Sequence, residues 1–161
     1  MSKMFVLTGT SGSYSDTYWG VVAVAHTRLP LQQLIKDLNA LSAWKSKWNA
    51  EKDRYKALHS DEIPQIPEPV LISKAHLGTG PDDIKHRYEI NRKNEALQIE
   101  HAKKVREIRD PAIADLIVRA EQFANDMCPM PPELKYASGY VQYEEYEIDE
   151  FNPIDEPNQV S

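Results

Sequence analysis

The chain has 161 residues, of which 25 are acidic and 19 are basic, giving a net charge of -6. This length allows one domain with its own hydrophobic core. The longest apolar run, residues 21–25, is far shorter than the roughly 20 residues of a membrane-spanning helix. The first residues contain no apolar stretch of a signal peptide, and a single cysteine, Cys128, excludes an internal disulfide. We therefore expect a cytoplasmic protein without membrane contact.

The negative charge is concentrated at the C-terminus. Residues 142–161 contain seven acids and no lysine or arginine, whereas the other residues contain 18 acids and 19 bases. We expect residues 151–161 to form an acidic, disordered tail, and an acidic segment of this kind can also bind a basic partner.

Two strands are predicted near the N-terminus, at residues 4–8 and 18–26, because both segments are rich in β-branched and aromatic residues. In the second strand both alternating sets are apolar. One set contains Trp19, Val21 and Ala23, and the other contains Tyr18, Val22 and Val24. This pattern predicts a strand covered on both faces, by helices on one side and by more helix or a second subunit on the other.

A helix is predicted for residues 31–59, where leucines recur at helical spacing in the first half. The second half is polar apart from a few aromatic residues, among them Trp44, Trp48 and Tyr55. These aromatic side chains either pack against the second long helix or form a partner-binding patch, since such residues are enriched in binding hot spots.

The middle of the chain is predicted to form an extended linker followed by two further helices. Three prolines in residues 63–69 favour polyproline II structure, and a charged helix is expected for 82–109. Asp110 and Pro111 fit an N-cap and a first helical position, so a new helix is expected at 111–127. Its apolar face is expected to pack on the sheet.

The last predicted element is a strand within residues 136–149. Val141 and Tyr143 share one phase of the alternation, while Tyr146 and Ile148 share the other. This slip predicts either a β-bulge near Glu144 and Glu145 or a strand whose two halves face different neighbours.

The loop at residues 9–16 is the candidate ligand site. Its glycines and the side chains of Ser13, Tyr14, Ser15 and Asp16 could surround a phosphate. However, the loop lies between two strands and has no lysine, unlike a phosphate-binding loop. The alternative is a turn stabilised by side-chain bonds to the backbone.

No residue pattern supports catalysis or a cofactor. The five histidines and Cys128 show no metal-ligand spacing, and no nucleophile motif is present. Lysines and arginines of the helix at 82–109 alternate with acids, which favours a solvated helix over direct nucleic-acid binding. We expect a protein that is not an enzyme and that has no metal or cofactor.

Two short motifs carry a resemblance to a known group of domains. Residues 12–16 (GSYSD) stand between the predicted N-terminal strands, and residues 144–149 (EEYEID) stand in the last one. In this order they resemble small uncharacterised domains common in bacteriophage genomes. The resemblance covers residues 4–38 and 136–149. It implies a β-β-α-β core and a phage or prophage origin, and it brings no assigned activity.

Together these features predict a single α+β domain, residues 1–150, with a small antiparallel sheet of about three strands, strand one at its centre, and a long charged helical insertion at 39–135. The leading hypothesis is a phage accessory protein that binds and inhibits a host protein, plausibly one of a defence system such as CRISPR. Its predicted contact residues are Trp44, Trp48, Tyr55, Glu144, Glu145 and Glu147. The alternatives are a nucleotide-binding module that uses the loop at 9–16, and an acidic nucleic-acid mimic. A homodimer is also expected.

Overall fold

The computed structural model describes residues 3–151, apart from the side chain of Tyr14. The chain forms two compact units, which we name the sheet unit (residues 1–50 and 125–161) and the helical unit (residues 51–124). The expected insertion at 39–135 is therefore longer than the helical unit. Apart from Phe151, which ends the last strand, the predicted tail lies outside the described residues.

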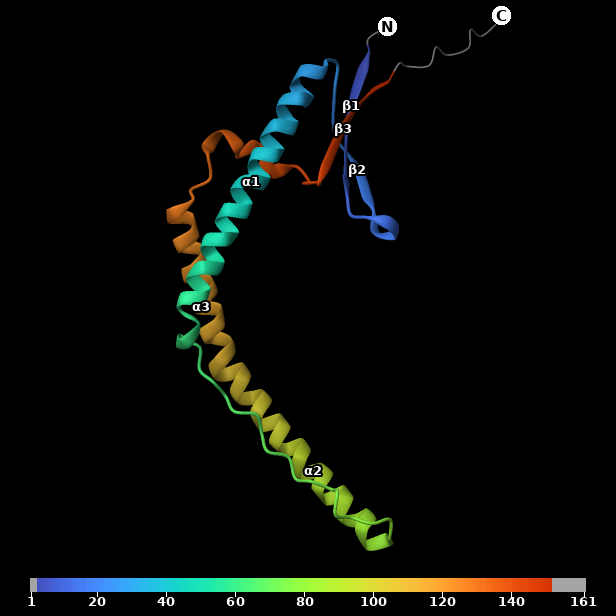
Figure 1. The fold of residues 1–161 in the computed structure, drawn as a ribbon, viewed down its shortest axis with the longest axis vertical. Coiled ribbons are helices and arrows are strands. Elements are labelled where there is room, and N and C mark those ends of the chain that lie inside the picture. The colour runs from blue at the N-terminus through green and yellow to red at the C-terminus, as the bar shows by residue number, and fades with distance from the viewer. Residues whose placement is uncertain (1–2, 152–161) are drawn as a thin grey trace, which may run out of the picture. The chain divides into compact units, whose positions relative to one another are not determined.

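The sheet unit is built on three antiparallel strands: β1 (Met4–Ser11), β2 (Tyr18–Ala25) and β3 (Glu145–Phe151). Their order in the sheet is β2-β1-β3, so the first strand is central and the other two form the edges (Figure 1). The predicted α+β class, the three antiparallel strands and the central position of strand one are confirmed.

A β-bulge in β2 changes which residues face the core. Leu7 of β1 pairs with Ala23 and Thr8 pairs with Val21, so Val22 has no partner across the strand. Because a bulge shifts the alternation by one residue, Val22 and Ala23 both lie on the core side. No helix of the described chain covers the opposite face, where Val21 and Val24 are exposed, and its predicted cover by a second subunit stays a prediction.

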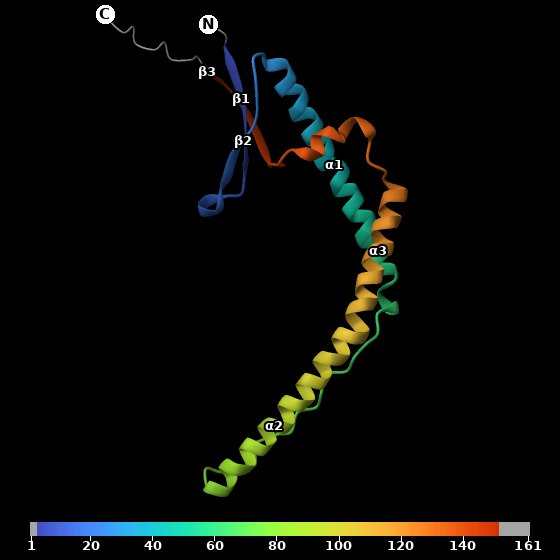
Figure 2. The same cartoon turned by 180° about the vertical axis from the view of Figure 1, so that it is seen from behind.

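One face of the sheet packs against helix α1 (Arg28–Leu58), as seen from both sides in Figures 1 and 2. Leu7 is fully buried and contacts a cluster of apolar side chains from α1 and from the 3-10 turns before β3: Leu31, Leu34, Leu38, Leu41, Leu134 and Ala137. Burial of this cluster removes apolar surface from water, which is the main stabilising effect in the unit.

The segment before β3 differs from the prediction. Residues Tyr136–Gly139 form a 3-10 turn, and the strand begins only at Glu145. The bulge expected near Glu144 and Glu145 was therefore wrong, because Val141 and Tyr143 precede the strand. The ring of Tyr143 lies over Gly9 and Gly20, where a Cβ atom at either glycine would overlap it.

The helical unit contains helix α2 (Pro81–Lys104) and an extended segment, residues 63–80, which we name the strap. Figure 1 shows the strap running back along α2. The Asn94 amide accepts a bond from the Ile72 N–H at 2.8 Å and donates to the Ile72 carbonyl at 3.1 Å. Arg87 donates to the carbonyls of Leu77 and Gly78.

A helix is present at the predicted residues 111–127, but the N-cap role predicted for Asp110 was wrong, because the helical backbone is continuous across this residue. A π-helical turn, Val105–Arg109, joins α2 to helix α3 (Asp110–Met127), and Asp110 has helical dihedral angles. The Asp110 N–H bonds to the Val105 carbonyl, five residues earlier. This wider turn immediately precedes Pro111, whose ring would clash with the carbonyl of Glu107 in a regular α-helix. The helix therefore continues through the proline.

The sequence had predicted that helix α3 packs on the sheet, and this prediction was wrong. Its buried residues, Leu116, Ala120 and Ala124, are not members of the cluster around Leu7. Within the sheet unit, Trp44 of α1 bonds to the Cys128 carbonyl and Trp48 bonds to Asn125. The later residue of α1, Trp48, contacts the earlier residue of the other segment, Asn125. Helices α1 and α3 therefore run antiparallel.

Candidate partner-binding surface

The face of the sheet opposite α1 is not covered within the described part of the chain, and we name it the open face. Directly paired residues of neighbouring strands lie on the same face, so the register assigns the members of this face. They form three rows across β2, β1 and β3: Val24, Val6 and Asp149; Val21, Thr8 and Glu147; Trp19, Thr10 and Glu145.

The β2 side of the open face is apolar and exposed to solvent. Trp19 is 74% exposed, Val21 60% and Val24 53%. β2 is also an edge strand without a charged residue or a proline, although natural edge strands usually carry one of these to prevent pairing. Exposed apolar side chains gathered in one place are typical of interaction sites, so this side of the open face is a candidate contact surface.

The β3 side of the open face is acidic. Glu145, Glu147 and Asp149 recur at every second residue, so their carboxylates point to the same side of the strand. In the described part of the chain none of these three carboxylates forms an ion pair. Glu145 and Glu147 were predicted as contact residues, and Asp149 lies on the same face of β3.

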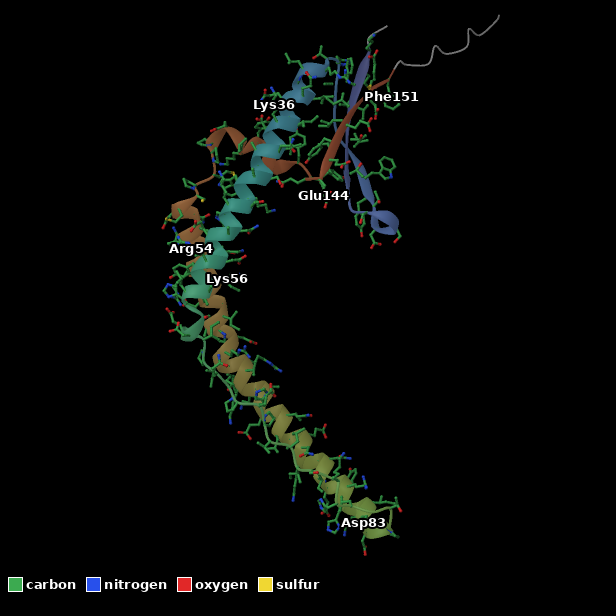
Figure 3. All side chains as sticks on the ribbon, viewed as in Figure 1. Lys36, Arg54, Lys56, Asp83, Glu144 and Phe151 are labelled. Atoms are coloured by element: carbon green, nitrogen blue, oxygen red, sulfur yellow. The ribbon has the colours of Figure 1, made fainter. Side chains whose placement is uncertain are left out.

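Glu144, the third predicted acidic contact, is placed differently. Figure 3 labels it at the start of β3, at the opposite end of that strand from Phe151. Its carboxylate accepts a bond from the Gly12 N–H at 3.2 Å, and its own N–H donates to Ser11 Oγ at 2.9 Å. Glu144 thus bonds the loop at 9–16 instead of extending the row of Glu145, Glu147 and Asp149, which we name the acidic column.

The bond between Gly12 and Glu144 also affects the candidate ligand loop at residues 9–16. Ser13 precedes a 3-10 turn formed by Tyr14–Asp16, and Gly12 has a φ of 90°, a conformation that favours glycine. The amide of Gly12 points to the Glu144 carboxylate, so an anion held there would be repelled by that charge. Ligand binding by Ser13, Tyr14, Ser15 and Asp16 stays a prediction.

The predicted aromatic contacts on α1 are half-buried and have intramolecular partners. Trp44 Nε1 donates to the Cys128 carbonyl at 3.0 Å, and Trp48 Nε1 donates to Asn125 Oδ1 at 2.8 Å. In the helical unit the ring of Tyr55 stacks on His59 and contacts Phe123. Cys128, Asn125 and Phe123 lie outside the predicted helix 82–109, so the rings pack within the chain at another place than expected. Their contact with another protein stays a prediction.

The titratable groups with shifted pKa values belong to surface contacts. Hydrogen bonds from Arg119 and His59 lower the pKa of Glu62, and the bond to Glu62 in turn raises the pKa of Arg119. A hydrogen bond to Asp37 raises the pKa of Tyr136 to about 12. Among residues 3–151 no group of three or more possible metal ligands comes together.

Within the described residues, none of the helices combines the length and the apolar character needed to cross a lipid bilayer. Comparison with protein-family models, with curated proteins and with solved structures finds no match for this chain. The open face therefore has to be interpreted from its own chemistry. Trp19, Val21 and Val24 were not predicted as contact residues from the sequence, although apolar residues in both phases of β2 were the available signal.

Proposed function

We propose that the chain is a non-enzymatic phage accessory protein that binds and inhibits a host protein, with a component of a host defence system as the expected target. The observation that supports this proposal is the exposed apolar column Trp19, Val21 and Val24 on the open face. A tryptophan on a rigid strand is a typical hot-spot residue, because it buries a large area at low cost in conformational entropy. The phage assignment rests on the motifs at residues 12–16 and 144–149.

The test is a pull-down from bacterial lysate with the tagged full-length chain, followed by an activity assay of the captured protein. We expect stoichiometric capture by the natural chain and loss of capture by Trp19→Ala. The matched control is Leu29→Ala, because Leu29 is equally exposed, at 74%, but lies on α1. Absence of any stoichiometric host protein, or a captured protein whose activity is unchanged, would refute the proposal.

A second candidate function is an acidic nucleic-acid mimic, and the acidic column Glu145, Glu147 and Asp149 favours it. A regular row of carboxylates can occupy a site that binds the phosphates of DNA or RNA. In this case the captured protein binds nucleic acid, and the chain competes with DNA for it. Competition that persists after all three acids are changed to amides would exclude this function.

A further inference from the structure

We propose that the open face is the docking site for a basic amphipathic helix of the partner protein, an inference that rests on the proposed function. Each of the three rows across the face changes from apolar on β2, through Val6, Thr8 or Thr10 on β1, to acidic on β3. A ligand that matches all three rows has an apolar surface along one side and positive charge along the other.

The width of the face fits one helix. Two inter-strand spacings separate β2 from β3, which is about 10 Å, and a helix with its side chains measures about 10–12 Å across. Along the strands the three rows extend for about 13 Å, which a helix covers with roughly nine residues. A helix that lies along β1 would bury Trp19, Val21 and Val24 under its apolar side.

Charge favours lysine or arginine on the β3 side of that helix. Within the described chain Glu145, Glu147 and Asp149 form no ion pair, whereas Lys3 bonds to Glu150 on the other face at 2.7 Å. Lysine and arginine reach a carboxylate with their heads while their stems cover apolar surface. Their attraction to three exposed carboxylates depends on salt concentration.

A partner strand that pairs with the edge of β2 would match the open face less well than a helix does. Such a strand would lie a further spacing away, about 14 Å from β3, so its cations could not reach the acidic column. A second copy that pairs through the same face also leaves the acids unmatched. Twofold symmetry places the acidic column opposite either the partner's acidic column or its apolar column.

The probe for this inference is a pair of synthetic 14-residue amphipathic helices with identical leucine stripes, one flanked by lysines and one by glutamates. We expect the full-length chain to bind the lysine peptide at least about tenfold more tightly than the glutamate peptide, with a preference that falls as salt is raised. The binding should be lost in Trp19→Ala.

A triple variant tests the acidic column directly. Glu145→Gln, Glu147→Gln and Asp149→Asn together are expected to weaken binding of the lysine peptide by about tenfold or more. The matched control removes the same number of charges elsewhere, through Glu89→Gln, Glu95→Gln and Glu133→Gln, and should bind as the natural chain does. All six side chains are exposed, so the fold should persist, and circular dichroism verifies this.

Three results would overturn the inference. The first is equal binding of the two peptides or binding unaffected by the triple variant. The second is new protection of β2 backbone amides from hydrogen exchange, which would indicate an added strand. The third is a dimer of this chain that Trp19→Ala dissociates. A host protein captured equally well by the natural chain and the triple variant overturns this inference alone, whereas failure to capture any protein refutes the proposed function.

Discussion

The interactions that stabilise the sheet unit differ from those that fix the strap to α2. In the sheet unit, Leu7, Leu38 and Leu41 are fully buried and pack in one apolar cluster. None of residues 63–109 is buried, and the strap is fixed by bonds from Asn94 and Arg87 to its backbone. The net contribution of one hydrogen bond to stability is only about 0.5–1.5 kcal/mol. Local opening of the strap should therefore cost less free energy than unfolding of the sheet unit.

The largest expected effect is on packing in the sheet unit. Gly9→Ala should lower the free energy of unfolding by about 1–3 kcal/mol, because the new methyl group overlaps the ring of Tyr143. The measurement is denaturant unfolding followed by tryptophan fluorescence. Gly139→Ala is the control, since a Cβ atom there meets no other atom within 4 Å. Equal losses in the two variants would show that packing of Tyr143 on Gly9 is not the cause.

A smaller effect is expected in the strap. Asn94→Ala removes both bonds to Ile72 and should lower the local opening free energy by about 1–2 kcal/mol. Hydrogen exchange at the Ile72 amide measures this change, and exchange at Leu7 in the sheet should stay the same. The control is Gln98→Ala on the same helix. Faster exchange at Leu7 in the Asn94 variant would contradict the separation of the two regions.

The smallest expected effect concerns the ion pair between Arg119 and Glu62 in the helical unit. Arg119 bonds to Glu62 at 2.6 Å, and this bond, with that from His59, lowers the pKa of Glu62 from its ordinary value. A depressed pKa stabilises the fold above the unfolded value, and this contribution disappears as pH falls through the folded value. Glu62→Gln should therefore slightly lower the melting temperature at pH 7.

The pH dependence provides the check on this last prediction. As the pH falls from 7 through the folded-state pKa of Glu62, the difference in melting temperature between the natural chain and Glu62→Gln should shrink, because protonation removes the same charge that the substitution removes. Glu95→Gln, at an exposed position without an ion pair in the described chain, should show no comparable trend. A difference that grows toward low pH would contradict the assigned role of Glu62.

Much of the fold was predictable from local patterns. The β-branched residues of β1 and β2 and the leucine spacing of α1 predicted these elements, since each pattern reports burial on one side of one element. The bulge at Val22 was not predictable, because Val21, Val22, Ala23 and Val24 are apolar in either register. As a result, the apolar half of the open face was predicted to be covered by further helix or by a second subunit.

Contacts between polar residues that lie far apart in the chain could also not be predicted from the sequence. Asn94 bonds to a backbone 22 residues away, and asparagine is equally common on solvated helices. The acids Glu145 and Glu147 were predicted because they lie close together in the chain. The apolar column on the other side of the same face could not be predicted without the strand register. The register places Glu145 and Trp19 on either side of Thr10.

The π-helical turn at Val105–Arg109 has a consequence for insertions and deletions in this chain. The turn holds one residue more than a regular α-helical ladder, so deletion of one residue there would restore regular bonding and preserve helicity. Because the wider turn accommodates this residue, α2 and α3 would keep nearly the same phase. Deletion of one residue in the regular part of α2 would instead rotate α3 by about 100° relative to the start of α2. The buried side of Leu116 and Ala120 would then turn toward solvent, so a change of one codon would alter the tertiary contacts while the secondary structure stayed the same.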